Sequence, residues 1–136
     1  YQDNKFARKT AAVYLSDFIS TTQASNLNLQ LANNIIYGAL ADEFTIDKKS
    51  TSTILTTNLR NNVFKTAKVN YADNLMNVDP SFVSPENYNF TLSNNSAMAK
   101  KGINLTADSY FSSFLNKDLK NNSRVFPSAL GCYEVN

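Results

Sequence analysis

Apolar and polar side chains alternate along several short stretches of this chain. Over residues 27–32 three leucines alternate with Asn, Gln and Ala, and over 44–47 Phe and Ile alternate with Thr and Asp. An alternation of period two is typical of a β-strand that buries one face. We therefore expect strands over 27–32 and 44–47. Residues 12–15 and 54–59 are expected to form further strands, because both contain β-branched residues.

An internal repeat organises these strands. Residues 27–37 (LNLQLANNIIY) return 28 residues later as residues 55–65 (LTTNLRNNVFK), with leucine at the first and fifth positions of both copies. Both copies then carry an Asn pair followed by two large apolar residues. A period between about 20 and 45 residues is typical of a solenoid, in which each repeat buries its apolar face against its neighbours. The sequence therefore predicts stacked coils.

The Asn pairs at 33–34 and 61–62 are expected to mark corners of successive coils. Asn tolerates left-handed backbone conformations and hydrogen-bonds its own backbone in turns. In stacked coils, equivalent Asn side chains lie about 4.8 Å apart, so that their amides form a ladder. The same register aligns Ile36 with Phe64, which predicts that Phe64 belongs to the core, and aligns Tyr37 with Lys65, which predicts an outward position for Tyr37.

The second half of the chain has a different character. Residues 78–85 contain two prolines and indicate a loop, and residues 89–92 indicate a short strand. Thr106 is expected to cap a brief helix whose apolar face closes an open end of the solenoid. We expect one continuous domain with β-helix coils over 1–70, and the last coil, loops and a C-terminal cap over 71–136.

Composition excludes several functional classes. The chain has 136 residues, a net charge of +2 and scattered Lys and Arg, so nothing indicates binding to nucleic acid. No apolar run approaches the roughly 18 residues expected of a transmembrane helix. The chain begins with Tyr1 rather than Met, and we expect a fragment whose N-terminal part lies outside this sequence.

Histidine is absent and Cys132 is the single cysteine. Zinc sites built from these ligands are therefore excluded, as are Ser-His and Cys-His nucleophile pairs within the chain. A single cysteine forms no internal disulfide. We expect Cys132 to be a buried, reduced thiol inside the C-terminal cap, because free cysteine usually behaves as a small apolar group.

A family resemblance emerges from the order of motifs in the second half. The motifs occur as 78–83 (VDPSFV), 89–92 (NFTL), 96–97 (SA), 118–124 (DLKNNSR) and 130–134 (LGCYE). This order resembles the C-terminal end of the secreted choice-of-anchor Q proteins, which are similar in fold to pectate lyases. The resemblance implies an all-β fold, a right-handed single-stranded parallel β-helix with a C-terminal cap. It also implies an extracellular or surface-anchored protein associated with polysaccharides.

Three acidic residues, Asp42, Glu43 and Asp47, lie near an expected corner. The pectate-lyase-like resemblance suggests calcium there, but calcium takes six to eight oxygen ligands and this cluster offers few. Only Glu43 and Asp47 are expected to point the same way. A solvated turn is therefore the favoured interpretation. We assign no metal site, no cofactor and no catalytic residue.

Tyr37, Arg60 and Lys65 are the candidate ligand-binding residues. The ring of Tyr37 offers a face for stacking on sugar C–H groups, and Arg60 or Lys65 offers a cation for a uronate carboxylate. The alternative for all three is ordinary surface exposure, because isolated charges and single exposed aromatics are common on protein surfaces.

We therefore expect a structural or glycan-binding C-terminal β-helix segment of a secreted or surface-anchored bacterial protein, located outside the cell or on its outer surface. Its expected partners are polysaccharide and the upstream coils of the same polypeptide, with no nucleic acid and no transmembrane segment. The alternative is part of a pectate-lyase-like polysaccharide lyase. For this chain alone we expect no lyase activity on polyuronates.

Overall fold

The fold is all-β. A computed structural model describes residues 8–135. In chain order the strands are β1 (Val13–Ser16), β2 (Phe18–Ser20), β3 (Gln23–Ala24), β4 (Leu27–Ala32), β5 (Ile35–Ile36), β6 (Phe44–Asp47), β7 (Leu55–Arg60), β8 (Val63–Phe64), β9 (Leu75–Met76), β10 (Phe82–Ser84) and β11 (Asn89–Leu92). Two short helical turns complete the set, η1 (Pro85–Asn87) and η2 (Phe111–Leu115). Within the described residues, no helix is long and apolar enough to cross a membrane.

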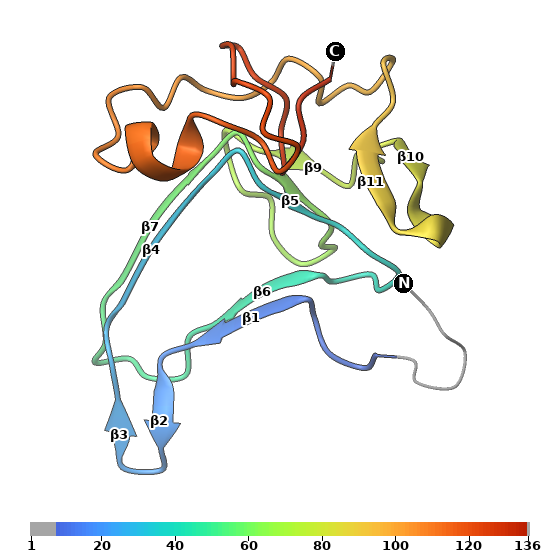
Figure 1. The fold of residues 1–136 in the computed structure, drawn as a ribbon. Helices are drawn as coiled ribbons and strands as arrows, with labels where there is room; N and C mark the ends of the chain where they lie inside the picture. Colours follow the sequence, from blue (N-terminus) through green and yellow to red (C-terminus); the bar gives the residue numbers. More distant parts are fainter. Residues whose placement is uncertain (1–7, 136) are drawn as a thin grey trace.

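Three sets of parallel strands form the sides of a triangle in Figure 1. β1 pairs with β6, β4 pairs with β7, and β5, β8 and β9 form a three-stranded sheet. Leu27 lies opposite Leu55 and Ile35 lies opposite Val63, so the 28-residue register predicted from the repeat is confirmed. The chain therefore passes the three sides in the same order twice.

The Asn pairs lie at equivalent corners, as predicted. Asn33 and Asn61 both adopt left-handed backbone conformations, with φ of 61° and 51°. The Asn34 side-chain amide donates to Asn62 Oδ1 at 3.0 Å, and the Asn62 amide donates to Asn74 Oδ1 at 2.9 Å. A ladder of three amides therefore spans the corner. The 28-residue period does not predict the third member, because Asn74 follows Asn62 by only 12 residues.

Aromatic rings fill part of the triangle. Phe44 of β6 and Phe64 of β8 stack with centroids 4.2 Å apart, and Tyr71 packs its edge against both. Both Phe rings are buried, which confirms Phe64 as a core residue. The leucines of β4, by contrast, are only half-buried, so the apolar interior along this side is incompletely covered.

The C-terminal third packs against the outer face of the β5–β8–β9 sheet. Val63, next to Phe64 on β8, points away from the triangle into a buried cluster completed by Leu92, Met98, Ala129 and Leu130. These contacts lie on the outer face of the sheet, and the expected closure of an end of the coils by this segment stays a prediction. The physical reason for the outer contacts is that β8 carries apolar residues on both faces, so that its outer face also has to be covered.

The helix expected after Thr106 is shorter and later than predicted. The helical turn η2 begins after Tyr110 and has no side-chain cap. Tyr110 and Phe114 are 65% and 74% exposed, so they form no buried apolar face. The chain between residues 101 and 110 instead runs past the Asn corner (Figure 1).

Side chains at the Asn corner hold the C-terminal segment in place. Asn33 exchanges two hydrogen bonds with the backbone of Ile103, at 3.0 and 2.8 Å, and its carbonyl accepts the Gly131 N–H at 2.8 Å. Asn61 donates to the Lys101 carbonyl at 2.7 Å. The corner residues therefore both turn the coil and anchor the segment that crosses it.

Two antiparallel hairpins were not predicted. β2 pairs with β3 and β10 pairs with β11. The strand expected at 89–92 is confirmed as β11, but its partner lies within the stretch that two prolines marked as loop. Phe82 and Phe90 meet edge to face across this second hairpin, with centroids 5.5 Å apart.

Candidate functional site

Two grooves lie beside the Asn corner. The first, here called the aromatic groove, runs between the end of β5 and the β10–β11 hairpin, and Tyr37, Phe82 and Phe90 line both of its adjoining hollows. These hollows measure about 450 and 500 Å³. Their polar margin comes from Asn33 and Asn34 on one side and from residues 79–81 on the other.

Tyr37 and Lys65 are brought together at this groove. The Lys65 ammonium lies 5.0 Å from the centroid of the Tyr37 ring, and it donates a hydrogen bond to the Gly38 carbonyl at 2.6 Å. A cation over a ring stabilises both groups by roughly 0.5–1 kcal/mol at an exposed site. The Lys65 ammonium is therefore already engaged, and the half-buried Tyr37 presents its ring at the rim of the aromatic groove.

Arg60 lies in the second groove, here called the amide groove. Its polar lining consists of Gln30, Asn34, Asn58, Arg60 and Asp108, with Leu115 of η2 at its border, and its volume is about 280 Å³. Gln30 and Asn58 lie directly opposite each other on β4 and β7. Within residues 8–135, the Arg60 guanidinium forms no ion pair. The groove therefore combines three side-chain amides and the Asp108 carboxylate with a guanidinium that forms no ion pair among the described residues.

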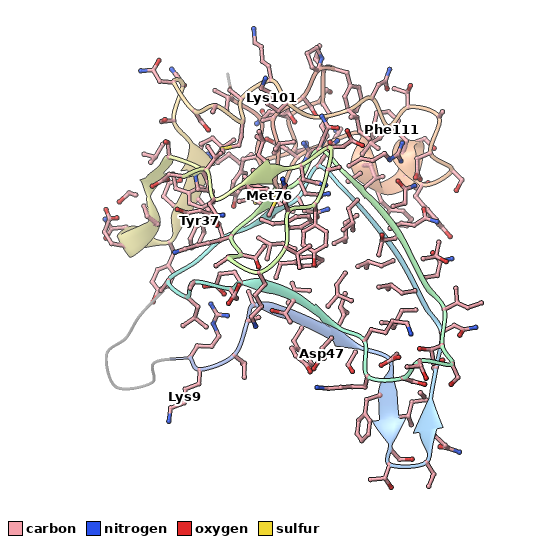
Figure 2. The ribbon with its side chains drawn as sticks, turned by 180° about the vertical axis from the view of Figure 1, so that it is seen from behind. Lys9, Tyr37, Asp47, Met76, Lys101 and Phe111 are labelled. Atoms are coloured by element: carbon pink, nitrogen blue, oxygen red, sulfur yellow. The ribbon has the colours of Figure 1, made fainter. Side chains whose placement is uncertain are left out.

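The three candidate ligand-binding residues do not form one site. Figure 2 shows Tyr37 beside the β10–β11 hairpin, whereas Phe111 of η2 lies on the other side of the molecule, with Lys101 above and between them. Arg60 belongs to the side of η2. The C-terminal segment crosses the corner between the two grooves and separates Arg60 from Tyr37 and Lys65.

Glu43 is a structural anchor instead of a solvated turn residue, so the expectation of a solvated acidic cluster is wrong for this member. Its side chain is fully buried and accepts hydrogen bonds from the Arg8 guanidinium at 2.8 Å and from the N–H groups of Leu40 and Ala12. Burial raises the pKa of Glu43, but the Leu40 N–H and the Arg8 guanidinium outweigh this effect and lower the pKa overall.

The other two acidic residues serve separate contacts. Asp42 accepts hydrogen bonds from the Thr66 hydroxyl and the Ala67 N–H, at 2.8 and 2.9 Å. Asp47 pairs with Lys49 and accepts a hydrogen bond from the Tyr14 hydroxyl. No group of three or more metal-ligating side chains occurs in the described part of the chain. The three carboxylates are therefore distributed among different elements.

Cys132 is exposed, so the prediction of a buried thiol is wrong. The neighbouring Gly131 has a φ of 82°, and its backbone packs against the side chain of Ile35. This close approach buries Leu130 and leaves the next side chain facing the aromatic groove. Partial burial still raises the pKa of the Cys132 thiol.

The remaining groove residues differ in how far the sequence pattern predicts them. Gln30 and Asn58 follow from the strand alternation, because they occupy polar, outward positions one repeat apart. Phe82 and Phe90 carried no such signal, since the hairpin that brings them to Tyr37 depends on a contact between distant parts of the chain.

Comparisons with family models, with curated proteins and with solved structures found no match for this chain.

Proposed function

We propose that this chain is a C-terminal segment of a right-handed parallel β-helix, with a structural role in a secreted or surface-anchored bacterial protein of the choice-of-anchor Q type. The supporting observation is the order of the parallel strands. β1, β4 and β5 are followed by β6, β7 and β8, and each member of the second set lies parallel to its counterpart in the first. Successive coils of a single-stranded β-helix have this relation.

Disulfide trapping tests the coil register. In a Cys132→Ser background, Asn28→Cys with Thr56→Cys places two thiols at directly opposite positions of β4 and β7. Opposite Cα atoms in neighbouring strands are about 4.8 Å apart, a separation that a disulfide spans. A second pair, Tyr14→Cys with Thr45→Cys, tests β1 against β6. We expect both pairs to oxidise within the monomer, as judged by mass spectrometry.

The matched control shifts one partner along its strand. Asn28→Cys with Asn58→Cys displaces the thiols by two residues, which separates the Cα atoms by roughly 8 Å, beyond the reach of an unstrained disulfide. Equal oxidation of the control and the test pairs would contradict the register. Failure of the β1–β6 pair alone would contradict the return of the chain to its first side.

Glycan binding is the second function that we propose, and the aromatic groove supports it. Three aromatic rings converge on its 500 Å³ hollow, with Asp79 and Ser81 at the margin, and this hollow is the sugar site that we propose. Aromatic faces pack against the C–H surfaces of sugars, and neighbouring polar groups bond to hydroxyls. The amide groove offers Arg60 as a separate contact for an acidic sugar.

Affinity electrophoresis through gels that contain neutral or acidic polysaccharide tests this second function. We expect retarded migration, weakened by Tyr37→Ala in both gels and by Arg60→Ala in the acidic gel only. Tyr14→Ala is the matched control, because Tyr14 is an exposed tyrosine on β1 that lines neither groove. Equal retardation of the parent and Tyr37→Ala would remove the aromatic groove as the sugar site.

A further inference from the structure

One edge of the coil is open. β4 pairs only with β7, and β5 pairs only with β8, among the strands that the structure describes. The Leu27 and Asn33 N–H groups donate to carbonyls of the β7 segment. In a parallel ladder this places the N–H groups of Asn28 and Gln30 on the opposite edge. These backbone groups form a template for another strand.

The Asn ladder has the same open side. Asn62 Oδ1 accepts from the backbone and side-chain N–H groups of Asn34, at 2.9 and 3.0 Å. Asn74 Oδ1 accepts from Asn62 in the same way, at 3.0 and 2.9 Å. At the far end, the Asn74 amide is bound by the Leu59 and Ala72 carbonyls. At the near end, no donor from residues 8–135 reaches Asn34 Oδ1. At the open edge, the ladder therefore ends in an acceptor, Asn34 Oδ1, that receives no backbone and side-chain N–H pair from the described residues.

An apolar space adjoins this edge. The 450 Å³ hollow of the aromatic groove is lined by Ile35 of β5 and by Phe82, Phe90 and Leu130, and it is not lined by the neighbouring strands β8 or β9. It therefore lies on the side of β5 that has no partner strand. On its partnered side, Ile35 lies next to Val63 of β8, and both side chains belong to the outer apolar cluster. A strand added to the other side of β5 would place an apolar side chain next to Ile35 in the same way, inside the 450 Å³ hollow.

We propose that the open edge of β4 and β5 binds an extended polypeptide strand of the same repeat, parallel to β4, with an asparagine opposite Asn34. The occupant is a preceding coil of the same polypeptide. The backbone and side-chain N–H groups of its asparagine donate to Asn34 Oδ1. The apolar residue that follows this asparagine enters the 450 Å³ hollow of the aromatic groove beside Ile35 and leaves the adjoining 500 Å³ hollow to the proposed sugar. This inference rests on the proposed β-helix and defines the chemistry that the adjoining coil has to carry.

The probe is a peptide that copies residues 27–37. We choose this sequence because its repeat, residues 55–65, already pairs with residues 27–37 in the structure. We expect saturable 1:1 binding of the fluorescein-labelled peptide to the full chain, measured by anisotropy. Replacing the eighth residue of the peptide, its second asparagine, by alanine removes one hydrogen bond to Asn34 Oδ1. That change should weaken binding by about fivefold to tenfold.

Variants of the chain locate the binding edge. Gln30→Pro removes an N–H from the open edge without touching the β4–β7 ladder, and it should reduce peptide binding at least tenfold. Thr57→Pro is the matched control: it removes an N–H from the opposite edge of β7 and should leave binding unchanged. Circular dichroism and thermal unfolding of both variants establish that they are folded before binding is compared.

The outcomes separate this inference from the proposed fold. Loss of binding in Thr57→Pro with retention in Gln30→Pro would overturn the inference, as would the absence of saturable binding at millimolar peptide. If the disulfide pairs oxidise as expected but the peptide does not bind, the β-helix stands and the open edge is not a strand-binding site. If the disulfide pairs fail, the proposed fold itself is contradicted.

Discussion

At the scale of single residues, asparagine performs two tasks at the corners. Asn33 and Asn61 accept the left-handed conformation at the bend, and Asn34 and Asn62, which follow them, bond to one another between the two repeats. A non-glycine residue other than Asn or Asp pays roughly 1–2 kcal/mol for this conformation. The two asparagines at each corner therefore have different roles. The first turns the chain, and the second forms the hydrogen bond that joins the two repeats.

Asn62 is the central amide of the ladder and is fully buried. Asn62→Ala removes the acceptor for Asn34 and the donor for the Leu31 carbonyl and for Asn74. Buried polar groups without partners cost about 1–3 kcal/mol each, so we expect a loss of about 3 kcal/mol in the free energy of unfolding. Urea denaturation measures it. The exposed Asn58→Ala should change stability by no more than about 0.5 kcal/mol, and equal losses in the two variants would contradict the role of the ladder.

We expect Asp118 to make the stability of the fold depend on pH. Burial raises its pKa, but the Glu134 N–H and the side chain and N–H of Asn122 outweigh burial and lower it overall. Stability from a lowered carboxyl pKa is present above the pKa of the unfolded chain, about 3.9, and is lost as the pH falls through the lower folded value. We therefore expect Asp118→Asn to unfold more easily than the parent at pH 5–7.

The difference between the parent and Asp118→Asn should shrink as the pH falls below about 4. Urea denaturation at a series of pH values measures this difference directly. Asp73→Asn is the control, because Asp73 is an exposed residue in a left-handed conformation that Asn also tolerates. A difference that stays constant down to pH 2 would show that the Asp118 carboxylate is not the titrating group.

At the scale of elements, β8 is the strand on which the two apolar clusters meet. Phe64 points into the triangle toward Phe44, and Val63 points outward to Met98 and Leu130. A strand buried on both faces is usually found inside a sheet that is covered on either side. Here the C-terminal segment supplies the outer cover, although it contains little regular structure of its own.

Met98 tests how much this outer cover contributes. Its side chain is fully buried, and Met98→Ala should destabilise the protein by about 3 kcal/mol, within the range for large-to-small core changes. Thermal or urea unfolding measures the loss. The control Val125→Ala truncates an apolar side chain that is 75% exposed, and its effect should stay within about 0.5 kcal/mol. A negligible effect of Met98→Ala would mean that the segment is only loosely attached.

Local patterns explain which elements could be predicted. β4, β6 and β11 were found because their alternation or β-branched content is contained within a few residues, and the 28-residue register followed from comparing two such segments. The outward packing of residues 96–135 could not be found in this way. It depends on Val63 and Ile35 meeting Leu130 across the fold, and no short window of sequence contains that contact.

In the candidate site, too, the sequence predicts only those contacts that follow from the repeat and not those made by distant segments. The sequence placed Tyr37 and Lys65 one repeat apart, which is why the structure has them side by side. Only its charge marks Arg60 as a candidate in the sequence, and its separation from Tyr37 depends on the C-terminal segment that crosses the Asn corner. Cys132 was misplaced because a single left-handed glycine, Gly131, decides which neighbouring side chain is buried.

At the scale of the whole molecule, the three sides of the triangle are unequally covered. The β5–β8–β9 side is packed on both faces, whereas the β4 leucines remain half-buried and β1 and β6 form a two-stranded side (Figure 1). Figure 2 shows Asp47 on this sparsely covered side. The stability of the fold is therefore expected to come mainly from the side with the Asn ladder.

The arrangement of charges over the whole molecule predicts the absence of lyase activity. Lyase chemistry on a polyuronate needs a base aimed at the C5 proton and a cation or metal on the uronate carboxylate. In the described part of the chain, Arg60 and Lys65 lie on different sides of the Asn corner, Lys65 is bound to Gly38, and no cluster of carboxylates is present for calcium. A base and a cation that do not face one hollow cannot act on the same sugar.

We therefore expect no unsaturated product from pectate or alginate, with or without calcium, in an ultraviolet absorbance assay with a known lyase as positive control. Turnover that disappears in Arg60→Ala or Lys65→Ala would instead establish the lyase alternative.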